Sequence, residues 1–291
     1  MNIQNTFLFI GGMALFIYGI TLTSKSMESF AFTEFKRFLN KIIARPIYAL
    51  GLGALFTSIV QSSSATTVTV ISLANSGILR FENTLGIIFG ANVGTTVTAQ
   101  IIAFHLTKYG LLIFAIGFLI TLSFKKEYTK AIGTAIMGFG LIFVGMQFME
   151  ASVAFMRESP YFVNLFIRLS EKPILGVLVA AGFTAIGQSS SVTIGIVQAL
   201  GAQQLLTLNA AFALVIGANI GTTVTALIAS IGGNIQARRV AVSHVIFNVI
   251  GALIFLIIFK PYVNLVSKTS GDLVRQIANA HTFFNIACAL S

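Results

Sequence analysis

A run of one glutamine and three serines occurs twice in the chain, as Gln61 to Ser64 and as Gln188 to Ser191, 127 residues apart. Serine hydroxyls donate hydrogen bonds to oxyanions, and the unpaired N–H groups at a helix start add donors at a positive dipole end. A single serine in that position usually only caps the helix. Because three successive serines exceed that need, we expect a small oxyanion to be bound by Ser62, Ser63, Ser64, Ser189, Ser190 and Ser191.

A ten-residue motif at 90–99 recurs at 217–226 with the same separation. It places two glycines and an asparagine within an otherwise apolar segment, which lowers helix propensity and predicts local unwinding that frees carbonyl oxygens. Such oxygens, together with amide and hydroxyl groups, suit Na+ beside a discontinuous helix. The expected sodium ligands are Asn92, Gly94, Thr95, Thr96, Asn219, Gly221, Thr222 and Thr223. Close helix packing through the glycines is the alternative.

The eight acidic residues all fall in predicted loops or at the ends of apolar segments. Proton-driven carriers usually place a titratable group within the membrane, so this pattern favours coupling to Na+ over coupling to H+. Two histidines are the exception, in the related sequences His244 to Asn248 and His281 to Asn285. Their spacing puts the histidine and the asparagine on one helical face, where hydrogen bonds between helices are the expected role.

The composition is that of a membrane protein. Of the 291 residues, 56% are hydrophobic and only 9% are charged, and the mean hydropathy is +0.92; soluble domains are roughly 25% charged. The excess of 18 Lys and Arg over 8 Asp and Glu lies between apolar runs, as membrane topology requires, and indicates no nucleic-acid partner. The predicted spans are 6–24, 84–104, 109–124, 131–150, 208–231 and 240–259, with interfacial helices at 25–43 and 151–171.

Two further apolar segments, 46–79 and 173–204, contain the serine runs. As one helix, the first would measure roughly 51 Å against a hydrocarbon core of about 30 Å. Broken at the serines, each segment becomes a re-entrant helical hairpin, and three crossings then precede residue 131, which gives the two halves opposite orientations. The predicted fold class is an all-α polytopic membrane protein with two inverted-topology repeats, each with a re-entrant hairpin and a discontinuous transmembrane helix.

The predicted domains follow from this repetition. Residues 1–130 form the first transmembrane repeat and residues 131–260 form the second. Residues 261–291 form an interfacial segment and the start of a final transmembrane helix. Its apolar run begins only 15 residues before the chain ends, so we expect the natural protein to continue.

The paired Gln-Ser-Ser-Ser and Gly-Ala-Asn-(Val/Ile)-Gly-Thr-Thr motifs resemble those of the type II sodium-dependent phosphate cotransporter family, specifically its bacterial members. The resemblance implies inorganic phosphate as substrate, Na+ as coupling ion with no further cofactor, and a location in the bacterial cell membrane. It also implies a cytoplasmic N-terminus, whereas the distribution of Lys and Arg between the loops favours the opposite orientation. It places Gln61 and Gln188 among the sodium-binding residues. It also implies a soluble PhoU-like domain after the membrane part, which this chain lacks, and leaves a homodimer possible.

Other functions remain open on the sequence alone. A helix-terminus site binds anions generally, so a sodium-coupled carrier of a dicarboxylate or of sulfate keeps the same fold. A phosphate-sensing membrane protein is another alternative. An intramembrane serine hydrolase is disfavoured because there is no Gly-x-Ser-x-Gly and the histidines lie far from the serines in sequence. We therefore expect no enzyme activity and no catalytic residues.

Overall fold

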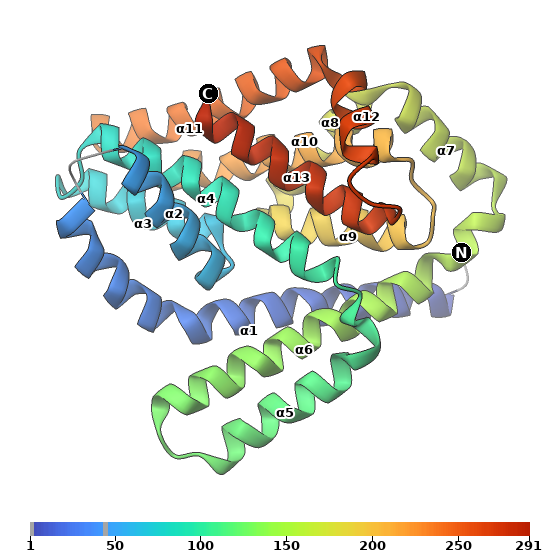
Figure 1. The fold of residues 1–291 in the computed structure, drawn as a ribbon, viewed down its shortest axis with the longest axis horizontal. Helices are drawn as coiled ribbons and strands as arrows, with labels where there is room; N and C mark the ends of the chain where they lie inside the picture. Colours follow the sequence, from blue (N-terminus) through green and yellow to red (C-terminus); the bar gives the residue numbers. More distant parts are fainter. Residues whose placement is uncertain (1–2, 43–45) are drawn as a thin grey trace.

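The computed structural model describes residues 3–42 and 46–291, and every regular element in these two ranges is a helix (Figure 1). The first half contains α1 (Ile3–Ile42), α2 (Pro46–Val60), α3 (Ser63–Asn75), α4 (Phe81–Ile102), η1 (Leu106–Tyr109) and α5 (Gly110–Ser123). The second half contains α6 (Glu127–Val153), η2 (Ala154–Glu158), α7 (Pro160–Glu171), α8 (Pro173–Gly187), α9 (Ser190–Ala202), α10 (Leu208–Ala229) and α11 (Ile235–Ile257). The chain then forms α12 (Phe259–Ser267) and α13 (Leu273–Leu290). The predicted first repeat also includes residues 1–2 and 43–45, which lie outside the described residues.

Within the described ranges, six helical stretches are long and apolar enough to cross a membrane, and each covers most of one predicted span. They are Ile3–Glu28, Phe81–Ile102, Leu106–Ser123, Glu127–Met156, Leu208–Ala229 and Ile235–Ile257. The all-α class and the multi-pass membrane location are therefore confirmed. One boundary was wrong: the span at 6–24 and the interfacial helix at 25–43 are a single helix through Ile42, because no proline or glycine after Gly19 interrupts it.

Both long apolar segments are broken at the serines, as predicted. Helices α2 and α8 end at Val60 and Gly187, and α3 and α9 begin at Ser63 and Ser190. A hydrogen bond between threonine hydroxyls joins the two helices of each pair, at 2.7 Å in the first pair and 2.6 Å in the second. The two halves thus fold alike around each break, whereas the re-entrant course through a bilayer and the inverted orientation remain predictions.

The predicted discontinuity in the transmembrane helices was wrong. Both α4 and α10 run without interruption through the glycine-containing motifs. Helix packing explains why: a Cβ atom at Gly94 would lie 2.8 Å from Thr57 Cβ on α2, and one at Gly221 would lie 2.7 Å from Thr184 Cβ on α8. The glycines therefore let a neighbouring helix approach closely, and this tertiary contact outweighs their low helix propensity.

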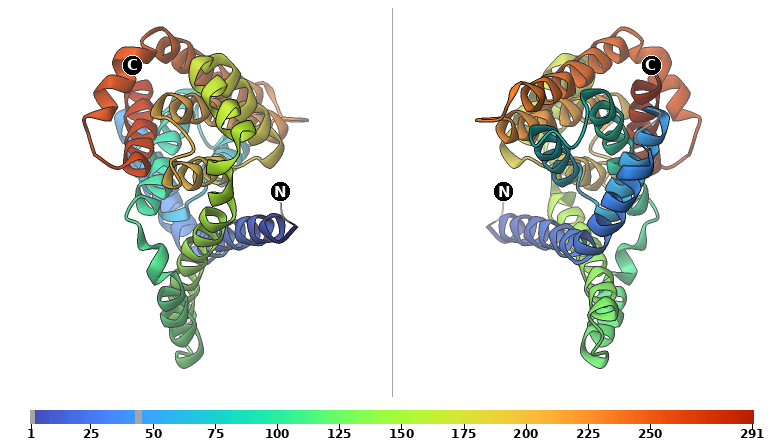
Figure 2. Two further views of the ribbon diagram at one scale, coloured as in Figure 1. Left: turned by 90° about the vertical axis from the view of Figure 1, so that its right-hand side faces the viewer. Right: turned by 90° about the vertical axis from the view of Figure 1, so that its left-hand side faces the viewer.

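Helices α1 and α6 pack against each other through glycines at reciprocal positions. A Cβ at Gly12 would lie 2.9 Å from the Gly145 carbonyl oxygen, and one at Gly138 would lie 2.8 Å from that of Gly19. The sequence relates Gly12 to Gly138 and Gly19 to Gly145. Gly12 therefore contacts the counterpart of Gly19, and Gly19 contacts the counterpart of Gly12, as a twofold axis between the halves would produce. The α5–α6 pair projects from the remaining helices (Figure 2).

Candidate functional site

The first serine of each run caps a helix. Ser62 Oγ accepts a hydrogen bond from Ala65 N at 3.1 Å, and Ser189 Oγ accepts one from Val192 N at 3.4 Å. These two hydroxyls therefore serve the N-termini of α3 and α9, as serine commonly does. The hydroxyls of the second and third serines lie in the first helical turn, beside the N–H groups at the positive end of the helix dipole.

Each glutamine that precedes the serines ends a helix in the left-handed backbone region. Gln61 has a φ of 57° and Gln188 a φ of 52°. This conformation is unfavourable for residues other than glycine and is found most often at functional sites and helix ends. Its occurrence at both repeat-related positions indicates that the sharp change of direction is a shared requirement of the two breaks.

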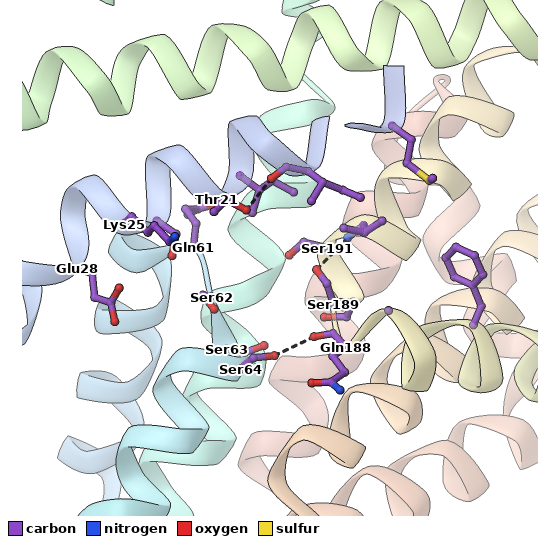
Figure 3. Close-up of a pocket in the computed structure, with 18 residues that line it drawn as sticks. Thr21, Lys25, Glu28, Gln61, Ser62, Ser63, Ser64, Gln188, Ser189 and Ser191 are labelled. Carbon is purple, nitrogen blue, oxygen red and sulfur yellow. Dashed lines mark hydrogen bonds between the residues drawn. The ribbon is translucent and has the colours of Figure 1, made fainter. Parts of the chain in front are cut away.

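The two breaks meet at one cavity of about 510 Å³ (Figure 3). Its lining includes all six predicted anion-binding serines together with both glutamines. The most direct link between the two runs is a hydrogen bond of 3.1 Å from Ser64 Oγ to the backbone oxygen of Gln188. The structure therefore brings together two serine runs that are 127 residues apart in sequence, at the starts of two helices whose positive ends face the same cavity.

One wall of the cavity comes from α1, which the sequence did not single out. The polar lining residues of this wall are Thr21, Ser24, Lys25 and Glu28, and Met13, Ile17 and Ile20 continue it. Their spacing of three and four residues places them on one face of a helix. That periodicity is a readable signal, but Lys25 and Glu28 fall within the predicted interfacial helix at 25–43 and so were not expected at the anion site.

The two glutamine side chains have different surroundings. Gln61 Oε1 accepts a hydrogen bond of 2.6 Å from Thr98 on α4, and its amide nitrogen donates to the backbone oxygen of Ser58. Gln188 is exposed, and the repeat-related hydroxyl of Thr225 on α10 is buried without a hydrogen-bond partner. The two equivalent sequences at the cavity thus differ in the hydrogen bonding and exposure of their glutamine side chains.

The two histidine-containing sequences form buried hydrogen-bond networks with the asparagines of the glycine motifs. Asn92 Nδ2 donates to Asn248 Oδ1 at 3.1 Å, and His244 Nε2 donates to Asn92 Oδ1 at 3.3 Å. The second network is equivalent, with Asn219 bonded to Asn285 at 2.6 Å and to His281 at 3.2 Å. The predicted role of the histidines in bonding helices together is confirmed.

The eight predicted sodium ligands of the glycine motifs lie on α4 and α10 and do not line the described cavity. The two asparagine side chains are engaged in the networks above, and Thr96 and Thr223 donate to backbone oxygens of their own helices at 2.8 and 2.7 Å. Of the expected sodium ligands, only Gln61 and Gln188 line the cavity. Sodium binding by the glycine-motif residues remains a prediction.

A multi-pass helical protein with short apolar helices that end at a shared polar cavity has the architecture of a membrane transporter. The sequence pattern of the Na+/Pi-cotransporter family matches residues 15–151 and 158–280. The chain therefore belongs to that family, whose substrates are phosphate and sodium.

Curated relatives agree with this assignment. The chain is 30% identical to the uncharacterized protein YqeW of Bacillus subtilis, over 94% of this chain and 89% of the relative. It is 28% identical to a protein of Escherichia coli K12 provisionally named inorganic phosphate export protein YjbB, over 97% of this chain and 52% of the relative, so it spans about half of that protein. Over 64 residues it is 44% identical to rabbit sodium-dependent phosphate transport protein 2A, which is 22% of this chain and 10% of the relative. No solved structure matches the chain.

Proposed function

We propose that the protein is a secondary active transporter that couples the movement of inorganic phosphate to that of Na+ by alternating access. The observation that carries the proposal is the meeting of the two serine runs, joined by the hydrogen bond from Ser64 to Gln188, at one cavity. Two helix N-termini and the hydroxyls beside them provide convergent donors for the several oxygens of a phosphate ion. Membership of the Na+/Pi-cotransporter family supports both substrates.

The proposed role of sodium is to offset the charge of the bound phosphate. A bound cation offsets the negative charge of phosphate in a site surrounded by apolar helices, so binding of each ion favours the other. We assign this role to the side-chain and backbone oxygens of Gln61 and Gln188, which already line the cavity. The hydroxyl and backbone oxygens of the glycine motifs on α4 and α10 are the further candidates.

Flux in proteoliposomes tests the proposal. Purified protein is reconstituted, and uptake of radiolabelled phosphate is measured with an inward Na+ gradient and with an equal K+ gradient. We expect uptake only with Na+. Equal uptake under both gradients, or none under either, would contradict sodium-coupled transport.

Serine substitutions locate the phosphate site in the same assay. Ser63→Ala and Ser190→Ala each remove a hydroxyl from the first turn of a helix at the cavity, and we expect each to raise the KM for phosphate about tenfold, because hydrogen bonds to charged groups contribute about 1.5–3 kcal/mol. Ser76→Ala is the matched control, since Ser76 lies at the other end of α3 and its hydroxyl bonds Leu73 O at 3.1 Å. Unchanged kinetics in both cavity variants would refute the assignment.

The direction of transport is decided by orientation and gradient. The YjbB relatives are named for phosphate export, whereas the rabbit relative is named for sodium-dependent phosphate transport. Measuring flux with the Na+ gradient applied in each direction shows which one drives net movement of phosphate. Competition by sulfate or a dicarboxylate in the same vesicles tests the alternative cargoes.

A further inference from the structure

The polar face of α1 brings one cation and one anion to the cavity. Among the residues that line it, Lys25 and Glu28 are the two with charged side chains, and the remaining polar ones are neutral serines, glutamines and a threonine. Figure 3 shows both side chains on the α1 side of the cavity. The electrostatic potential that a bound ion meets therefore depends on these two residues and on the helix dipoles.

The two charges are not used to hold the fold together. Within the described residues, neither Lys25 nor Glu28 forms an ion pair, with the other or with a third side chain. Their order on the helix contributes to this, because a lysine three residues before a glutamate is less favourable than the reverse. Both groups are consequently available to interact with an ion in the cavity.

A lysine at the end of a membrane span usually extends to the lipid headgroups, and this is the simpler explanation for Lys25. Its position argues against that explanation. Lys25 lines the same cavity as the six serines, on a helix face that changes from apolar at Met13 and Ile17 to polar at Thr21. Contact with α6 is made by a different face of α1, which carries Gly12 and Gly19.

We propose that Lys25 provides the positive charge that attracts a tetrahedral oxyanion into the cavity, and that Glu28 limits the negative charge that the cavity accepts. This inference rests on the proposed function, because it adds a charge-selective element to the same site. The hydroxyls and N–H groups of α3 and α9 recognise the oxygens of the ion, whereas the α1 pair sets the preference between singly and doubly charged forms. Arginine at position 25 would keep the charge, and glutamine would remove it at similar length.

Equilibrium binding of radiolabelled inorganic phosphate to the purified full chain, at saturating Na+, tests the proposal. We expect Lys25→Gln to raise the Kd for phosphate about tenfold, Lys25→Arg to stay within about twofold of the unaltered protein, and Glu28→Gln to lower the Kd. Lys130→Gln is the matched control, because Lys130 is paired with Glu127 on α6 at 3.9 Å and is absent from the cavity lining. Raising the ionic strength with choline chloride should shrink the effect of Lys25→Gln.

The opposite signs of the two substitutions separate electrostatics from a loss of structure, which would weaken binding in both. A Kd for Lys25→Gln equal to that of Lys130→Gln overturns the inference. An unchanged Kd in Glu28→Gln overturns the role given to Glu28, and weaker binding in this variant overturns the inference by making its carboxylate a ligand for Na+. If the unaltered protein shows no sodium-dependent phosphate binding, the proposed function itself fails, and that result is distinguishable from both.

Discussion

Thr98 donates a hydrogen bond of 2.6 Å to Gln61 Oε1, and this bond has no equivalent in the second half of the chain. Thr225, which corresponds to Thr98, is buried without a partner, although Gln188 is present at the position that corresponds to Gln61. The two halves therefore place the same residue types in different local states around one cavity. In a protein that exposes its site alternately to two sides, such asymmetry is what a single state would show.

The Thr98–Gln61 bond predicts unequal effects of two matched substitutions. Thr98→Val removes the donor to Gln61 and should destabilise the protein by about 1 kcal/mol, whereas Thr225→Val removes an unpartnered buried hydroxyl and should be neutral or stabilising. The chain has no tryptophan, but its single cysteine, Cys288, is buried. A thiol-reactive fluorogenic dye therefore reports unfolding on heating. Equal shifts in melting temperature would show that the asymmetry has no energetic basis.

The asparagine–histidine networks predict a large cost for losing an asparagine. Asn92→Ala leaves the buried His244 Nε2 and Asn248 Oδ1 without a hydrogen-bond partner, and we expect destabilisation of about 2–3 kcal/mol. Asn219→Ala should behave similarly because its network has the same bonds. A double-mutant cycle between Asn92 and Asn248, followed with the same dye, measures the coupling. Additive effects of the two substitutions would contradict a shared network.

The contact of α1 with α6 predicts opposite behaviour of two neighbouring glycines. A Cβ at Gly12 would lie 2.8 Å from Phe148 Cβ, whereas a Cβ at Gly11 meets no atom within 4 Å. Gly12→Ala should therefore destabilise the protein by about 1–3 kcal/mol, because the helices must separate. Gly11→Ala is the control and should be neutral or slightly stabilising, since alanine favours helix. Melting temperatures of the two variants decide between close packing and a purely conformational role for Gly12.

The lowered pKa of Asp272 predicts that the protein becomes less stable at acidic pH. Burial raises the pKa of its carboxyl group, but hydrogen bonds from His105 at 2.9 Å and from backbone N–H groups of α13 outweigh this, and the net pKa lies below the ordinary value of 3.8. A lowered folded-state pKa means that the stabilisation is fully present above the ordinary pKa and is lost as the pH falls through the folded-state value. The difference in melting temperature between the unaltered protein and Asp272→Asn should thus be constant near neutral pH and shrink below about pH 4. A constant difference down to pH 3 would argue against the assigned ionisation.

The sequence predicted the breaks in the two apolar segments because it combined a length too great for the bilayer with a capping residue at the break. It did not predict the continuity of α4. Glycines within a helix favour either unwinding or close packing, and the choice depends on α2, whose Thr57 lies against Gly94. The cavity wall was missed for a related reason. Lys25 follows an apolar run and falls within the predicted interfacial helix at 25–43, but the packing of α1 makes it a lining residue of the serine cavity.

The cavity lies between the two halves of the chain, which constrains the evolutionary origin of the protein. Each half carries one serine run and therefore half of the proposed anion contacts, so an ancestor with a single copy would have needed two chains to assemble the cavity. If the repeats are inverted, those two chains had to insert in opposite directions. Gene fusion would then have fixed a one-to-one ratio of the two orientations, after which the cavity residues of each half were free to diverge, as the different surroundings of Gln61 and Gln188 show.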